Sequence, residues 1–295
     1  MYGAKSEEKK LSKRVNHKDL TAPQKSALVK AILALKNNVD SVLHPGQQKR
    51  YDDFVEVHKN AMMGPGMFHP MPHGTPLFYP WHRVMLRQFE LALQSAAKDP
   101  TLSLPYWDWS TAGSSNPFTT NFLGGDGDAA QGGRVTTGPF AFSTGNFTIR
   151  VWDNATGDPG LRREFGDDFT SFLPTSTQVA AGLAKVPYSP GPSSFERVSE
   201  GMLHNPVHRW VGGNMADATS PNDPVFFLHH TFLDLLWEQW KTQHASSAPY
   251  LPTSGSPDFD VNATLVFNAS GNPAPWLGTW TVNQVLNPSN LSYTY

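Results

Sequence analysis

The sequence predicts a mainly α-helical protein, in which a four-helix bundle core houses a dinuclear metal site, with long irregular loops and a few short β-strands. Eight of the eleven histidines fall in two short segments, residues 58–82 and 204–230. Several segments repeat apolar residues at spacings of three and four, as amphipathic helices do. Helical bundles build metal sites from side chains that project inward. A chain of 295 residues is compatible with one domain, residues 1–295.

Two helices are predicted in the first part of the chain. Residues 21–38 begin with Thr21 as N-cap and Pro23 in the first turn. Residues 51–62 place apolar side chains and His58 on a common face. Taken alone, His58 is better explained as a core histidine with one hydrogen bond than as a metal ligand.

A proline-rich loop follows. Prolines 65, 70, 72, 76 and 80 exclude a regular helix and predict a stiff, extended segment. A helix is then expected from Trp81 to Ala97, with His82 in its first turn. Histidines 58, 73 and 82 would form a first group of three, two on helices and one on the loop.

The segment 199–241 carries the second group. Because proline interrupts helices, we predict a helix that starts at Pro206, with Asn205 as its cap. His204 then lies just outside the helix and His208 inside it, and a spacing of four keeps the two imidazoles adjacent.

A further helix is predicted from Pro224, with Asn222 or Asp223 as its cap. It carries His229 and His230, which point about 100° apart around the helix axis. Only one of them is expected to face the site of the preceding two histidines.

The remaining segments predict packing rather than chemistry. Residues 104–110, LPYWDWS, indicate aromatic core beneath the site. Residues 111–192 are rich in Gly, Ser, Thr, Asn and Asp and predict loops with short strands. In the tail, residues 245–295, apolar and polar residues alternate along the runs FDVNATLVF and GTWTVNQVL. This pattern predicts an edge hairpin or a small sheet.

Composition excludes several functional classes. The net charge of −2 and the lack of a long basic run argue against nucleic acid or an anionic membrane as partner. No apolar run approaches the roughly 18 residues of a membrane span. The start of the sequence lacks the apolar core of a secretion signal, so the chain is either intracellular or has lost a leader. The absence of cysteine leaves only nitrogen and oxygen as metal ligands.

The ligand type narrows the choice of metal. Imidazole alone suits copper or zinc, whereas non-haem iron and hydrolytic di-zinc sites usually include a carboxylate. Apart from Glu200, no acidic residue stands at ligand spacing within either group. Asp234, one turn after His230, is expected to orient a liganding imidazole. We therefore predict two copper ions, each held by three imidazoles, with dioxygen as co-substrate bound between them.

Four segments carry a resemblance to a known family: HGTPLFYPWHR, LPYWDWS, LHNPVHRWVGGNM and SPNDPVFFLHHTFLDLLW. They resemble, in order, the motifs of the tyrosinase family of type 3 copper proteins, especially its short bacterial members. The resemblance extends from about residue 20 to 245, with copper motifs within 51–97 and 194–241. It implies a first copper held by His58, His73 and His82, and a second held by His204, His208 and His230.

The resemblance also implies an activity: ortho-hydroxylation of monophenols and oxidation of o-diphenols to o-quinones. In the family, a glutamate and an asparagine are thought to hold the water that deprotonates the phenol. Asn205 matches the asparagine, Glu200 is our choice for the glutamate, and Glu196 is a second candidate. Both glutamates are also explicable as solvated helix charges.

The resemblance assigns three residues to the substrate pocket, Arg209, Ala218 and Phe226. A small side chain at Ala218 predicts an open entrance that admits bulky phenols. Without cysteine, the thioether bond of some relatives is impossible, so His73 is expected to be held by loop packing alone. Since only about 50 residues follow the last copper motif, we expect an enzyme that is active as made, or one that a separate copper-delivering partner controls.

Alternative functions stay open at this point. A catechol oxidase or an o-aminophenol oxidase would use the same centre without hydroxylating monophenols. A haemocyanin-type dioxygen carrier would shield the centre from phenols, and a zinc hydrolase on a helical bundle would contain no copper.

Overall fold

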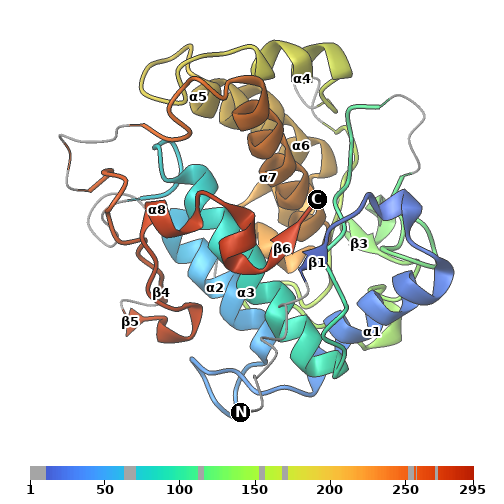
Figure 1. Cartoon of the computed structure of the whole chain (residues 1–295). Coiled ribbons are helices and arrows are strands. Elements are labelled where there is room, and N and C mark those ends of the chain that lie inside the picture. Colours follow the sequence, from blue (N-terminus) through green and yellow to red (C-terminus); the bar gives the residue numbers. More distant parts are fainter. Residues whose placement is uncertain are drawn as a thin grey trace, which may run out of the picture.

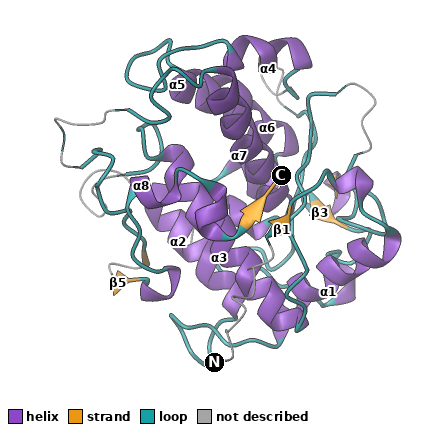
Figure 2. Ribbon diagram, viewed as in Figure 1, coloured by secondary structure: helices purple, strands orange, loops and turns teal. Residues whose placement is uncertain are grey.

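The computed structural model describes residues 11–62, 71–111, 116–152, 157–167, 172–251, 256, 258–269 and 272–295 of the chain. Helices carry most of its regular structure, and each strand is only two residues long (Figure 2). The fold is therefore mainly helical, as predicted. None of the helices in these ranges combines the length and the apolar character that crossing a membrane requires.

The longer elements have the following bounds: α1 Ala22–Asn37, α2 Arg50–Met62, α3 Phe78–Ala97, α4 Ser176–Leu183, α5 Phe195–Ser199, the π-helical turn η4 Glu200–His204, α6 Asn205–Val211, α7 Val225–Gln243 and α8 Val282–Val285. The strands are β1 Ser12–Lys13, β2 Gly127–Asp128, β3 Arg134–Val135, β4 Asn268–Ala269, β5 Asn272–Pro273 and β6 Tyr293–Thr294. Short 3₁₀ turns connect them: η1 His17–Asp19, η2 Ala129–Gln131, η3 Phe142–Thr144, η5 Gly213–Ala216, η6 Ser220–Asn222, η7 Pro275–Leu277 and η8 Pro288–Leu291.

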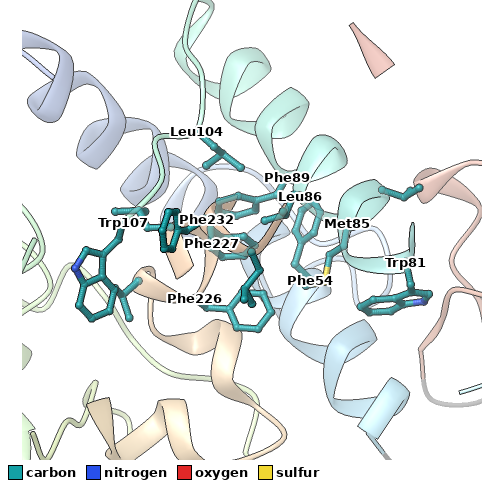
Figure 3. Close-up of a cluster of buried hydrophobic side chains, with 14 of the residues drawn as sticks. Phe54, Trp81, Met85, Leu86, Phe89, Leu104, Trp107, Phe226, Phe227 and Phe232 are labelled. Carbon is teal, nitrogen blue, oxygen red and sulfur yellow. The ribbon is translucent and has the colours of Figure 1, made fainter. Parts of the chain in front are cut away.

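Four helical segments form the central bundle: α2, α3, α7 and the continuous run α5–η4–α6 (Figure 1). Helices α3 and α7 meet through Phe89 and Phe227, whose rings stack with centroids 3.5 Å apart (Figure 3). The ring of Tyr51, on α2, packs edge-on against both. Aromatic residues dominate this contact because each buries a large apolar area. The bundle core lies beside the histidines and holds their helices in place.

The first three helices begin close to their predicted positions. Thr21 caps α1 in a capping box with Gln24, as its place before Pro23 indicates. Helix α3, however, starts at Phe78 rather than at Trp81, so the prediction that Pro80 precedes the helix was wrong. Proline is tolerated there because the first turn of a helix has no acceptors for its N–H groups. The oxygens of Thr75 accept from the N–H groups of Leu77 and Phe78 instead.

The prediction that a new helix starts at Pro206, with Asn205 as its cap, was also wrong. The backbone stays helical from α5 through η4 into α6, and the N–H of Asn205 donates to the carbonyl of Glu200, five residues back. A π turn contains one residue more than an α turn and shifts the carbonyls that would otherwise meet the proline ring. Pro206 is thus accommodated inside the helix, and the side chain of Asn205 is free for another role than capping.

Helix α7 begins at Val225, one residue after the predicted start. Asp223 performs the predicted capping role, because its Oδ1 accepts from the N–H of Val225 at 3.0 Å. The same carboxylate receives two hydrogen bonds from Arg163, at 2.6 and 2.9 Å. This buried ion pair fixes the helix that carries His229 and His230.

The C-terminal tail differs from the predicted hairpin. FDVNATLVF and GTWTVNQVL meet in one isolated antiparallel bridge, Thr264 to Thr281. Directly after the bridge, Thr281 forms a capping box with Gln284 and starts α8. The N–H groups of Leu265 and Asn283 also donate to the carbonyls of Trp280 and Val261, so the predicted antiparallel pairing of the two runs is present. The second run forms no strand because a capping signal interrupts it.

Both ends of the described chain meet where β1 and β6 pair in parallel (Figure 1). Beneath them Asp234, on α7, accepts hydrogen bonds from Arg83 at 2.7 Å, Tyr293 at 2.6 Å and Tyr295 at 2.5 Å. The expectation that Asp234 orients a liganding imidazole was therefore wrong. Its carboxylate instead neutralises buried arginines, and their charges hold the pKa of Asp234 below its ordinary value despite burial.

Replacing Tyr293 by phenylalanine should lower the free energy of unfolding by about 2 kcal/mol, the usual contribution of a hydrogen bond to a charged group. The change removes one donor from Asp234 and leaves the ring in place. Urea unfolding of the metal-free protein measures it, with Tyr106→Phe, whose ring is only partly buried, as control. An unchanged midpoint for Tyr293→Phe would contradict this account of the network.

Candidate metal centre

The first histidine group brings together a helix, a loop and a second helix. His58 stands on α2, His73 on the segment before α3, and His82 on α3. One ring nitrogen from each lies within 4.8 Å of the others. The beginning of the predicted proline-rich loop, residues 63–70, lies outside the described residues.

The second group contains four histidines: His204 at the end of η4, His208 on α6, and His229 and His230 on α7. The indole N–H of Trp109 donates to Nδ1 of His229 at 3.0 Å. Since a neutral imidazole has one N–H, this bond leaves the proton of His229 on Nε2, which then cannot bind a metal. The other three keep nitrogens that are available.

Hydrogen bonds to Nδ1 determine the tautomer of four histidines. His58, His82 and His208 donate to the carbonyls of Ala218, Phe78 and Met215, at 2.9, 2.8 and 2.7 Å. His204 donates to Oδ1 of Asn205 at 2.8 Å. Each ring therefore presents a bare Nε2, the arrangement of a metal-binding imidazole.

Buried nitrogens without partners mark where a metal belongs. Within the described residues, no hydrogen bond reaches Nε2 of His58, His82 or His204, nor either ring nitrogen of His73. Nε2 of His229 and Nδ1 of His230 have no partner there either, so the hydrogen bond from Trp109 is what distinguishes these two histidines. Nε2 of His208 and Nε2 of His230 lie 3.3 Å apart. Leaving such polar atoms unpaired is costly unless a ligand satisfies them. The nitrogen-only donor set fits two copper ions.

The two triads face each other. The rings of His82 and His230 stack with centroids 4.4 Å apart, and those of His73 and His204 are 6.4 Å apart. Phe226 is fully buried among them, with its ring centroid 4.9 Å from that of His58 and 4.1 Å from that of His230. Phe226 thus packs an apolar ring against one histidine of each triad.

Burial lowers the pKa of every histidine in both groups. The pKa falls to about 3 for His73 and about 4 for His208, mainly because burial disfavours the charged form. For the other members burial is again the largest cause, followed by neighbouring imidazoles. All six rings of the two triads are therefore neutral at neutral pH, the protonation state that binds metal.

The metal-free protein should lose stability as the pH falls below about 6.5, the ordinary pKa of histidine. Below that value the histidines of the unfolded chain bind protons, whereas His73 and His208 in the folded chain bind them only near pH 3 to 4. Each buried histidine then lowers the free energy of unfolding by up to about 1.4 kcal/mol for each unit by which the pH falls. Urea midpoints of the metal-free protein at pH 7.5, 6.5 and 5.5 test this, and equal midpoints at all three would contradict it.

A cavity of about 250 Å³ opens onto both triads. Its walls include four of the histidines together with Asn205, Arg209 and Ala218. The volume is near the small end for small-molecule sites, as a single aromatic ring requires. Both Asn205 and Arg209 are exposed at the surface side of the cavity.

Two residues that the sequence assigned to the active site lie outside the walls of this cavity. Phe226 packs behind the histidines, with no exposed surface. Glu200 is buried and accepts from the backbone N–H of Gly74, with both carboxylate oxygens 2.9 Å from that nitrogen. His73 is therefore not held by packing alone, because the residue after it is anchored by a carboxylate.

Sequence reasoning missed the groups that orient the imidazoles. Three of the acceptors are backbone carbonyls, which no residue pattern identifies. Trp109 was recognised as core, but only the fold shows that its indole N–H selects between His229 and His230. The pairing of Glu196 with Glu200 had a signal, a spacing of four on a helix, which the predicted break at Pro206 obscured.

Known proteins match this chain over the segment that contains both histidine groups. Residues 48–243 match the family described as the common central domain of tyrosinase. The chain is 42% identical to a tyrosinase of Streptomyces antibioticus over 265 residues, which cover 85% of this chain and 91% of the relative. It is 34% identical to the grixazone synthase of Streptomyces griseus, over 85% of this chain and 92% of that protein.

Solved structures show the same fold. A mutant polyphenol oxidase from Thermothelomyces thermophila superimposes with a TM-score of 0.70 at 24% identity, covering 97% of this chain and 88% of that one. Latent apple tyrosinase superimposes with a TM-score of 0.59 at 21% identity, covering 97% of this chain and 62% of that one. The two histidine triads of this chain are consistent with a dinuclear type 3 copper site.

Proposed function

The chain belongs to the tyrosinase family, and from this premise we propose that it uses dioxygen to hydroxylate monophenols at the ortho position and to oxidise o-diphenols to o-quinones. The observation that carries the proposal is the pair of facing imidazole triads at the base of a cavity sized for one aromatic ring. Copper, when bound there, supplies dioxygen binding and two-electron redox chemistry.

We assign the first copper to His58, His73 and His82, and the second to three histidines of the other group: His204, His208 and His230. The support is the set of bare Nε2 atoms and, for His229, the hydrogen bond from Trp109 that occupies its Nδ1. Neutral imidazoles keep both oxidation states of copper accessible.

The chain's own residues bind and orient the phenol. Entry is through the cavity mouth, where Arg209 places a positive charge and Ala218 a small side chain. A carboxylate-bearing phenol gains a favourable ion pair with Arg209, and Ala218 leaves room for a bulky ring substituent. Phe226 packs against histidines of both triads and lies outside the cavity wall, so we assign it a packing role rather than contact with the substrate.

Deprotonation of the incoming phenol needs an acceptor near the cavity, because the pKa of a free phenol is about 10. Asn205 lines the cavity, and its Oδ1 is engaged with His204, so its NH₂ group is directed to hold a water. The glutamate partner of that water, Glu200 or Glu196, lies deeper. We propose Asn205 as the residue that positions the water.

Oxygen uptake by copper-loaded protein, with L-tyrosine and L-DOPA in parallel, tests the function. Uptake with both substrates, together with quinone colour, is expected. Uptake with the diphenol or an o-aminophenol alone would replace the proposal by a catechol or o-aminophenol oxidase. Absence of uptake, despite a new near-ultraviolet absorption band on adding hydrogen peroxide, would indicate a dioxygen carrier. A separate copper-delivering partner stays a prediction from the sequence.

A further inference from the structure

Two glutamates lie side by side beneath the first triad. Glu196 is on α5 and Glu200 begins η4, so they are neighbours on one helix face. Both are buried, Glu196 completely. Within the described residues, no N–H or hydroxyl group donates to either carboxyl oxygen of Glu196, and the neighbouring group that acts most strongly on its pKa is the carboxyl of Glu200. The pair is largely shielded from solvent, and the Gly74 N–H and the Arg197 guanidinium approach Glu200 rather than Glu196.

Two buried carboxyl groups in contact cannot both be charged, so they hold one proton between them. Burial, followed by the charge of Glu200 and a hydrogen bond to it, raises the pKa of Glu196 to about 9. Burial also raises the pKa of Glu200, but the Gly74 N–H, the hydrogen bond with Glu196 and the charge of Arg197 oppose that rise. The proton therefore resides on Glu196 and the negative charge on Glu200.

The charge on Glu200 is directed at the loop that carries His73. Both of its oxygens lie 2.9 Å from the backbone nitrogen of Gly74, the next residue. Gly74 has a φ of +68°, which favours glycine, and a Cβ there would lie 3.0 Å from Nη1 of Arg197. The loop thus takes a turn that brings its N–H onto the carboxylate.

His73 depends on this anchor more than the other five proposed ligands do. It is the one that stands outside the helices in the described structure. Neither of its ring nitrogens has a hydrogen-bond partner there, although the carbonyl of Ala61 is close enough to act on its pKa. A second hydrogen bond to the loop comes from the hydroxyl of Tyr188, which donates to the carbonyl of Pro76 at 2.8 Å.

We propose that Glu196 and Glu200 act as a single-charge pair that positions His73 through the Gly74 amide and so retains the first copper. Glu196, as the neutral acid, donates to Glu200 and keeps its carboxylate oriented. Glu200, as the anion, holds the loop. Both are positioning residues, and the inference rests on the proposed function only in that His73 binds copper.

The test compares Glu196→Gln with Glu196→Ala. A glutamine amide donates a hydrogen bond as the neutral acid does, so Glu196→Gln should retain copper as the parent protein does. Glu196→Ala and Glu200→Ala remove the donor and the anchor, and should speed copper transfer to an excess of a cuprous chelator about tenfold or more, the usual effect of losing a residue that orients a ligand. Glu164→Ala, at an exposed glutamate outside both histidine groups, is the matched control.

A second measurement needs neither copper nor substrate. Hydrogen exchange of the backbone amides of residues 71–78 in metal-free protein should accelerate in Glu200→Ala and Glu196→Ala, and stay slow in Glu196→Gln. Glu200→Gln keeps an acceptor for Gly74 without the charge, and should exchange at an intermediate rate even if the alanine variant fails to fold.

The proposal is overturned if Glu196→Gln loses copper as fast as Glu196→Ala, because an ionised Glu196 would then be required. It is also overturned if Glu200→Ala leaves exchange of the loop unchanged. A parent protein that is inactive toward phenols would overturn the proposed function instead, and the exchange comparison would still decide the role of the pair.

Discussion

Replacing His230 by glutamine is expected to leave one copper ion per chain, whereas replacing His229 by glutamine leaves two. The two residues are adjacent on α7, equally buried and chemically identical, so only their hydrogen bonds distinguish them. Trp109 donates to Nδ1 of His229 and thereby places the remaining proton on Nε2. Nε2 of His230 instead faces Nε2 of His208 at 3.3 Å.

The rates should follow the copper content. His230→Gln is expected to lower o-diphenol oxidation at least about a thousandfold, because groups that act as a unit fail together when one is removed. His229→Gln retains an acceptor for Trp109 and should stay within about tenfold of the parent. Copper is counted by atomic absorption on protein loaded and then dialysed. Two ions in His230→Gln, or one in His229→Gln, would reverse the assignment.

Replacing Asn205 by alanine should lower monophenol hydroxylation about a hundredfold, the lower end of what a positioned proton acceptor contributes. Oxidation of o-diphenols should fall by about tenfold or less, because that loss comes only from the hydrogen bond between Asn205 and Nδ1 of His204. On the proposed function, Asn205 has two separable roles, one in proton transfer and one in ligand orientation.

Asn205→Asp separates these roles. Aspartate still accepts from His204, so copper content and o-diphenol oxidation should be close to those of the parent, while the NH₂ group that holds the water is gone. Initial rates with L-tyrosine and L-DOPA, normalised to copper, measure the split. Equal losses on both substrates in Asn205→Ala would show that the residue supports the ligand alone.

The sequence by itself determined the helical class, the positions of the bundle helices and the two groups of histidines. These features depend on local signals: the apolar spacing in α2, the capping residue Thr21 and the spacing of four between His204 and His208. A local signal also led to the two wrong helix boundaries, at Pro80 and Pro206. A proline cannot donate the intrahelical hydrogen bond of a backbone N–H. The sequence does not show whether that bond is needed, because a first turn or a π turn can leave it unnecessary.

Only the tertiary structure decided which atoms face one another. The hydrogen bond between Trp109 and His229 joins residues 120 positions apart, and so does the one between Tyr79 and Ser199. The hydrogen bond from Gly74 to Glu200 spans 126 positions. Asp234 has the right spacing to orient His230, yet it binds Arg83 of α3 together with Arg14 and Tyr293 from the two ends of the described chain. Residue types and spacing determine which side chains share a helix face, but the direction of a hydrogen bond between distant segments is set by packing.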